Sequence, residues 1–169
     1  MKNYVLALLM LAISSVRAQQ ANFNKTLADF CAEALSQTNS IAAERKILLD
    51  SLAEEMTNKR YLMFTCKTNS RRTLLLQAWA QTAFIDAGLY NKFAISTGDT
   101  ITEVYPEIAN VLSASGFYCS KAKNGKEQGY LISVNNKLPI NIMLSKSYFG
   151  TIDTRHIVIA NICAQNESS

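Results

Sequence analysis

Short apolar runs alternate with helical segments from residue 60 onward, and this order constrains the fold most. The spacing of apolar residues predicts a buried strand at Tyr61–Phe64 and a helix from Arg72 to Gly88. The remaining predicted elements are a strand at 93–98, a helix at 106–115, an antiparallel hairpin at 130–144 and a final, central strand at 156–163. Strands that alternate with helices indicate an α/β fold. We therefore expect three layers around a small, mainly parallel sheet, with an inserted β-hairpin and an N-terminal helical extension.

The first eighteen residues, MKNYVLALLMLAISSVRA, have the pattern of a secretory signal. An apolar run from Tyr4 to Ile13 follows Lys2, and Val16-Arg17-Ala18 fits a small-x-Ala cleavage site. The run is shorter than the ~20 residues of a spanning helix, and an uncleaved membrane anchor is the alternative reading. We expect a signal peptide at 1–18, a helical hairpin within 19–59 and an α/β domain at 60–169.

Removal of the signal changes the charge balance. Lys2 and Arg17 would leave while no acidic residue does, so the formal net charge would fall from +4 to +2. This near balance gives no support to a nucleic-acid partner. We expect an exported protein with no stable membrane insertion after cleavage, and the sequence leaves its oligomeric state open.

Four cysteines, Cys31, Cys66, Cys119 and Cys163, are spread too widely for a compact metal motif. The sequence thus predicts no metal and no cofactor. Cys66 and Cys163 both follow predicted strands, so we expect them at the carboxyl edge of the sheet, where such folds bind ligands. Cys119 follows a helix and is expected at the opposite edge, and Cys31 on the buried face of an N-terminal helix.

The stretch TCKTNSRRT, Thr65 to Thr73, connects a predicted strand to a predicted helix. Backbone N–H groups of such a loop and the helix dipole favour a bound anion. Arg72 can grip two oxygens of a phosphate with its planar guanidinium. The same field favours the Cys66 thiolate, which is the nucleophilic form of the side chain. The other reading is a buried cysteine beside a helix cap, and the residues alone leave both open.

The remaining loop residues have roles consistent with an oxyanion site. Asn69 tolerates a left-handed backbone and can tie the loop with its amide. Thr73 is expected to donate its hydroxyl to the Cys66 sulfur. The other substrate-binding candidates contribute mainly backbone N–H groups: Lys67, Thr68, Ser70 and Arg71.

The segment from Phe64 to Thr73, followed by Gln77-Ala78-Trp79-Ala80, resembles the signature of low-molecular-weight protein tyrosine phosphatases and of the thioredoxin-linked arsenate reductases that share their fold. The family pattern is cysteine, two residues, asparagine, two residues, arginine, then serine or threonine. The resemblance covers roughly residues 60 to 165, and the N-terminus is similar to an exported bacterial branch, which implies a periplasmic location. It implies that Cys66 attacks phosphorus to form a phosphocysteine while Arg72 binds the phosphate and stabilises the transition state.

The sequence departs from this pattern at two places. The family uses an aspartate in a late Asp-Pro pair to protonate the leaving oxygen, and no Asp-Pro pair occurs in the 169 residues. Asp99 and Asp153 are the nearest substitutes, although solvated loop carboxylates are the simpler reading of both. The family's last strand and closing helix are also expected to be missing, as in a C-terminally shortened relative or a truncated gene product.

These departures keep two alternatives to phosphomonoester hydrolysis open. The first is arsenate reduction by thiol chemistry, in which the resemblance makes Cys163 the redox partner of Cys66, against a free thiol at that position. No second cysteine follows Cys163, so a complete two-cysteine relay is absent. The second alternative is a catalytically impaired protein that still binds an oxyanion.

Overall fold

The computed structural model describes residues 23–67, 69, 71–98, 106–124, 127–135, 139–142 and 153–162 of the 169. The predicted signal at 1–18 lies outside these residues, as do Thr68, Ser70, Asp99 and Cys163. Within the described part of the chain, no helix is long and apolar enough to cross a membrane.

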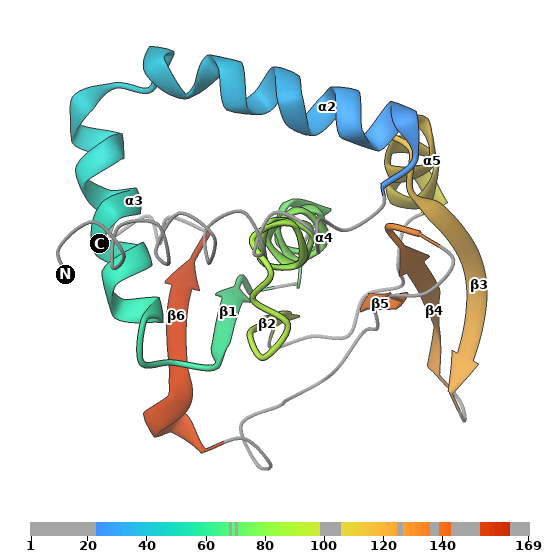
Figure 1. The fold of residues 1–169 in the computed structure, drawn as a ribbon. Coiled ribbons are helices and arrows are strands. Elements are labelled where there is room, and N and C mark those ends of the chain that lie inside the picture. Colours follow the sequence, from blue (N-terminus) through green and yellow to red (C-terminus); the bar gives the residue numbers. More distant parts are fainter. Residues whose placement is uncertain are drawn as a thin grey trace, which may run out of the picture.

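A parallel sheet of three strands, in the order β2-β1-β6, confirms the predicted α/β class (Figure 1). Its strands are β1 (Tyr61–Thr65), β2 (Phe93–Thr97) and β6 (Ile157–Asn161). β1 pairs with both neighbours over its whole length and is the central strand. The prediction that the last strand is central is wrong, because among the described strands β6 pairs only with β1. Ile159 in the middle of β6 is 54% exposed, as expected at an edge.

Helix α4 (Arg71–Asp86) connects β1 to β2, and α5 (Pro106–Ala114) follows β2. Both helices end where the sequence predicts, at glycines with positive φ: Gly88 at +72° and Gly116 at +96°. At Gly88 the N–H of Leu89 donates to the carbonyl of Phe84 five residues back, which satisfies a carbonyl of the last turn. Glycine fits this turn because the left-handed conformation costs it nothing.

A second, antiparallel sheet consists of β3 (Tyr118–Asn124), β4 (Glu127–Ser133) and β5 (Pro139–Ile142), in that order. The pairing of β4 with β5 confirms the predicted hairpin. Strand β3 was not predicted from the sequence, and it pairs with β4 over seven residues. Cys119 therefore lies inside a strand of this second sheet, so its predicted place at the opposite edge of the parallel sheet is wrong.

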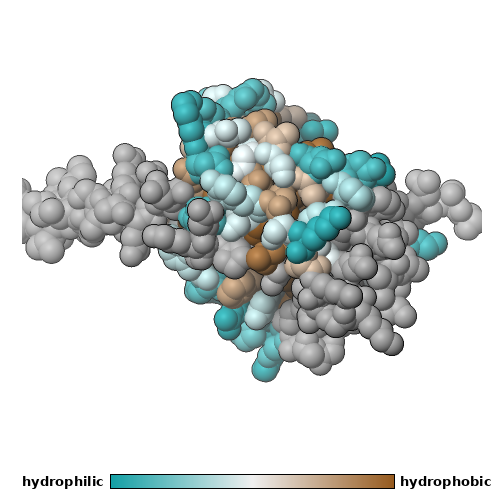
Figure 2. All heavy atoms as spheres, turned by 90° about the vertical axis from the view of Figure 1, so that its right-hand side faces the viewer, coloured by the Kyte–Doolittle hydropathy of each residue, from teal (hydrophilic) through white to brown (hydrophobic). Residues whose placement is uncertain are grey.

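Two apolar clusters form the core, and α4 contributes to both. One joins α2 (Lys25–Ser36), α4, α5 and the second sheet around Leu27, Leu74 and Leu112, with Trp79 edge-on to Phe117 at 5.1 Å between ring centroids. The other joins α4 and α3 (Ala43–Met56) to one face of the parallel sheet. Figure 2 looks onto the side that carries α5 and β3, and shows mostly hydrophilic residues with small hydrophobic areas between them.

The N-terminal helices form an elbow, where the sequence predicts a hairpin. The chain changes direction between α2 and α3 at the 3₁₀ turn η1 (Gln37–Ser40), and α3 descends beside β6 (Figure 1). Leu27 near one end and Met56 at the other are buried, but every residue from 32 to 51 is exposed. We call residues 32–51 the elbow. It is attached to the body at both ends and stands away from it between them.

Candidate oxyanion site at the end of β1

The loop after β1 lies at the carboxyl edge of the parallel sheet, as predicted. The N–H of Cys66 donates to the carbonyl of Thr97 at the end of β2, at 3.2 Å. On the other side, the N–H of Ile162 donates to the carbonyl of Thr65 at 3.0 Å. Cys66 is thus held between the ends of two neighbouring strands. Only 7% of its surface is exposed.

Asn69 has the left-handed backbone that the sequence predicts for it. Its φ of 44° is the one positive φ of a non-glycine residue in the described chain, and the residue is 98% buried, with 2% exposed. Its N–H donates to the Cys66 carbonyl at 3.3 Å, which closes the loop into a tight turn. Its side-chain oxygen accepts the Thr73 hydroxyl at 2.9 Å. Asparagine pays less than most residues for this left-handed conformation.

One donor at this site is buried and unused. The side-chain nitrogen of Asn69 has no hydrogen-bond partner among the described residues. A buried N–H group without an acceptor costs about 1–3 kcal/mol, so native proteins seldom keep one without a reason. An anion is the kind of group that would satisfy it.

Gly98 supports the loop by close approach, a role that local sequence does not indicate. A Cβ atom at this position would lie 2.2 Å from the backbone nitrogen of Asn69 and 2.6 Å from the carbonyl oxygen of Cys66. Both contacts are with backbone, so neither can yield by a rotamer change. Beside it, the buried Ser96 hydroxyl donates to Gln77 Oε1 at 2.7 Å, which ties β2 to α4. The loop is therefore packed against the end of β2.

Three basic residues, Lys67, Arg71 and Arg72, surround the loop and are exposed. Arg72 lies in the first turn of the sixteen-residue α4, where the helix dipole also favours negative charge. Within the described chain its guanidinium has no hydrogen-bond or ion-pair partner. It is thus available for an exogenous anion. Thr68 and Ser70, the other two predicted contributors, lie outside the described residues.

Cys66 is disulfide-bonded in the structure. Cys31 and Cys119 are free thiols, and burial raises the pKa of both. A sulfur in a disulfide is not a thiolate and cannot attack phosphorus. The nucleophile predicted from the sequence is therefore present in its oxidised form, and it requires reduction before it can react.

The proposal of Asp153 as a substitute acid is wrong. Asp153 caps the short 3₁₀ helix η2 (Thr154–His156) in front of β6, so it lies at the amino edge of the sheet, away from Cys66. Its carboxylate bonds Arg155 at 2.7 Å, and this contact holds its pKa below the usual value. Asp99, the other substitute, lies outside the described residues.

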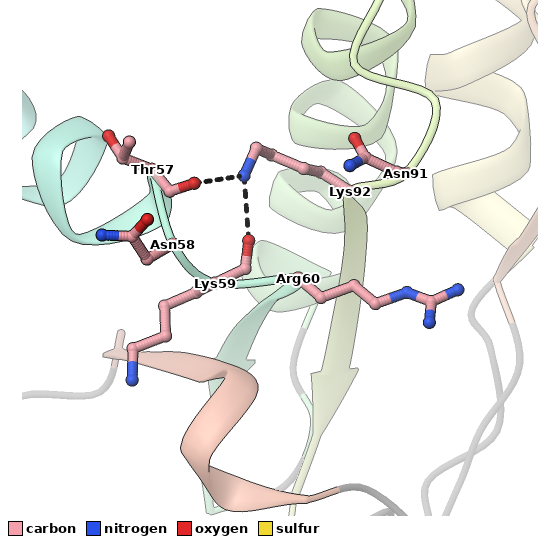
Figure 3. Close-up of a pocket in the computed structure, with 6 residues that line it drawn as sticks. All are labelled: Thr57, Asn58, Lys59, Arg60, Asn91 and Lys92. Carbon is pink, nitrogen blue, oxygen red and sulfur yellow. Dashed lines mark hydrogen bonds between the residues drawn. The ribbon is translucent and has the colours of Figure 1, made fainter.

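A hollow of about 440 Å³ lies at the amino edge of the parallel sheet and is separate from the loop (Figure 3). Lys92 projects toward the end of α3, where its ammonium donates to the carbonyls of Met56, Thr57 and Lys59 at 2.6, 3.2 and 2.9 Å. The Arg60 guanidinium lies over the stacked rings of Tyr61 and Phe93. These cations have structural partners, so we read this hollow as a junction between elements.

No group of three or more His, Cys, Asp or Glu residues in the described chain is arranged to hold a metal ion. Comparison with models of protein families, with curated proteins and with solved structures gives no match. The site is therefore interpreted from its own geometry.

Proposed function

We propose that this protein hydrolyses phosphomonoesters, of the kind found in phosphotyrosine, through a phosphocysteine on Cys66. The observation that carries the proposal is the loop around Asn69: a left-handed, 98% buried asparagine with an unused amide donor, between a cysteine and a helix N-terminus. A loop that only connected a strand to a helix would not need this arrangement. The proposal includes export from the cell, which rests on the sequence of residues 1–18 alone.

In the proposed reaction the reduced Cys66 thiolate attacks the phosphorus atom. An S–P bond forms, the bond from phosphorus to the ester oxygen breaks, and the leaving alcohol takes a proton from water or an acid still to be assigned. Water then attacks the phosphocysteine, which releases inorganic phosphate and restores the thiol. Arg72 and the helix terminus stabilise charge on the oxygens in the transition state.

The test is hydrolysis of an aryl phosphate by the fully reduced protein, with Cys66→Ser and Arg72→Ala as variants. We expect no turnover from Cys66→Ser and a loss of about 10²–10³ in kcat from Arg72→Ala, as for loss of one oxyanion donor. Arg45→Ala is the matched control, because Arg45 is exposed in α3, outside the site, and should leave kcat unchanged. Equal turnover in wild type and Cys66→Ser would contradict the proposal.

A second candidate is a protein that binds an oxyanion and no longer turns it over. The observation that favours it is the position of Asp153, which removes one of the two substitutes for the missing acid. General acid catalysis contributes ~10²–10⁴ in rate, so its absence weakens turnover without abolishing binding. The reduced protein would then be stabilised by phosphate through linkage and would release none from an aryl ester.

Arsenate reduction is the third candidate, and the disulfide on Cys66 is the observation that favours it. A reductase would consume two thiol equivalents for each arsenate reduced to arsenite, so thiol loss measured against arsenate separates it from the other two.

A further inference from the structure

We propose that the outer edge of β6 binds an extended polypeptide segment by strand addition, and that this segment carries the phosphate that the oxyanion site receives. The inference rests on the proposed function of that site, because it names the form in which the substrate is presented. Its starting point is the place of β6 in the sheet. Among the described strands β6 pairs only with β1, so no described strand lies on its other side.

The backbone of β6 offers hydrogen-bonding groups on that outer side. Successive residues of a paired strand point their N–H and C=O groups to alternate sides. The carbonyl of His156 and the N–H of Ile162 bond to β1, which assigns the even-numbered residues to the inner side. The outer side therefore carries the N–H and C=O groups of Ile159 and Asn161. Within the described chain none of these groups has a hydrogen-bond partner.

This edge lacks the features by which proteins usually block such pairing. Edge strands are commonly protected by lysines, prolines or bulges. The sequence of β6, IVIAN, contains no charged residue and no proline, and its register with β1 is continuous. α3 runs beside β6 in Figure 1 and packs through Met56 on the sheet face that carries Val158. Ile159 points to the opposite face and is 54% exposed, so an added segment could cover it.

The size of the edge favours a peptide segment over a second copy of the chain. A stable interface between two folded proteins buries about 800 Å² on each partner, from about 20–30 residues a side. β6 has five residues. Strand addition works with so short a contact, because main-chain hydrogen bonds hold the segment and alternate side chains select it. The expected occupant is therefore an extended segment with an apolar side chain beside Ile159.

The carboxyl end of β6 leads this segment to the oxyanion site. Asn161 is the register partner of Thr65, directly before Cys66. Neighbouring strands lie ~4.8 Å apart, so a strand added outside β6 would run about 10 Å from β1. A phosphotyrosine holds its phosphate beyond an aromatic ring and can reach over most of that distance, whereas a phosphoserine holds its phosphate on one carbon. The exposed Lys67 and Arg71 beside the loop favour acidic residues near the phosphate.

The first arm of the test locates the segment on the reduced protein by amide hydrogen exchange. The probe is a synthetic peptide of alternating valine and glutamate with a central tyrosine, without phosphate. At ten times its Kd the unbound fraction falls to about one tenth, so the amides of Ile159 and Asn161 should exchange about tenfold more slowly. The amides of Val158 and Ala160 face β1 and should change little. Slow exchange at Ile159 and Asn161 without peptide would overturn the proposal, and its dependence on protein concentration would identify a second copy as the occupant.

The second arm compares hydrolysis of the phosphotyrosine form of this peptide with that of an aryl phosphate. Ile159→Pro removes one outer N–H, and proline is tolerated at such an edge position. It should raise KM for the peptide about three- to tenfold, as for the loss of one hydrogen bond, and leave kcat/KM for the aryl phosphate unchanged. Ile159→Val is the matched control and should leave both values unchanged. Peptides N-methylated at odd or at even residues test the same bonds without a change in the protein, and KM should rise for at least one of them.

Failure of the proposed function has a different signature from failure of strand addition. If the peptide slows exchange at Ile159 and Asn161 but neither substrate is hydrolysed, the phosphatase function is wrong and strand addition at β6 remains. If the aryl phosphate is hydrolysed while the peptide protects neither amide, and neither Ile159→Pro nor N-methylation raises KM, strand addition is overturned and the oxyanion site remains.

Discussion

At the scale of single residues, the candidate site depends on atoms that approach one another from different elements. Cys66, Asn69 and Thr73 could be predicted from the sequence because they belong to one local pattern whose roles follow from their chemistry. Gly98 could not, because its importance lies in the 2.2 Å that would separate its Cβ from Asn69, twenty-nine residues away.

The two glycines Gly98 and Gly88 give a matched pair of substitutions. Gly98→Ala should abolish stabilisation by phosphate in the reduced protein and cost about 1–3 kcal/mol of unfolding free energy, since backbone must move to admit the methyl group. Gly88→Ala has open space but a φ of +72°, so it should cost about 1–2 kcal/mol through strain alone and leave the phosphate response intact. Urea unfolding with and without phosphate measures both. A Gly98→Ala protein that still responds to phosphate would contradict this view of the loop.

Cys31 gives the protein a dependence on alkaline pH. Burial, and to a smaller extent Asp86, raises the pKa of this thiol above its ordinary value of about 8.5. The folded form therefore keeps its proton where the unfolded chain loses it, so this contribution to stability is complete below the unfolded pKa and is lost as pH rises through the folded one. We expect the stability difference between wild type and Cys31→Ala to narrow from pH 7.5 to pH 10, measured by urea unfolding of reduced protein. A difference that stays constant over this range would show that the thiol does not titrate with folding.

At the scale of elements, apolar runs predicted the strands β1 and β2 correctly, and helical periodicity followed by a terminating glycine predicted α4 and α5. These signals are local in the sequence, because they reflect the burial of nearby residues and the capping of a helix end. The strand β3 was missed since its sequence, YCSKAKN, is polar and basic and reads as a loop. It is a strand because β4 pairs with it across its whole length, which local sequence does not encode. The edge position of β6 likewise depends on tertiary contacts.

Lys92 illustrates how one side chain joins elements. Its ammonium binds three carbonyls at the end of α3. A cation at the C-terminal end of a helix also interacts favourably with the helix dipole. Lys92→Met keeps the aliphatic stem and should cost about 2 kcal/mol, in the range for hydrogen bonds to charged groups. Lys46→Met is the control: it removes an exposed pair with Asp50 and should cost only about 0.3–0.5 kcal/mol. Equal unfolding free energies for the two variants would show that the Lys92 bonds add nothing.

At the scale of the whole molecule, stability is distributed unevenly. The body has two buried clusters that share α4, whereas the elbow has no buried residue between 32 and 51. Helical periodicity in the sequence indicated two helices there, but it could not show that their apolar residues are left uncovered. Leu35, Ile47 and Leu48 are 63%, 68% and 70% exposed.

We expect the elbow to open locally far more often than the body. In native-state hydrogen exchange, amides of residues 32–51 should exchange much faster than those of β1, because few buried contacts oppose their opening. Leu48→Ser should change the unfolding free energy by no more than about 0.5 kcal/mol, whereas Leu27→Ala should cost about 2–5 kcal/mol. Slow exchange across the elbow would mean that something covers it in solution.

The central position of β1 has a consequence for biosynthesis. β1 is complete at residue 65, but one of its two partners, β6, begins at residue 157. At about 5–20 residues per second, a ribosome needs roughly 5–20 s to make the intervening chain. During that time the backbone groups on one edge of β1 have no strand to pair with. The pairing of β1 with β6 is also among the most distant in sequence that the described fold contains, and such long-range contacts slow folding. A nascent chain with this order cannot complete the parallel sheet until nearly all of the described sequence has been made, and this delay would suit the export that we propose.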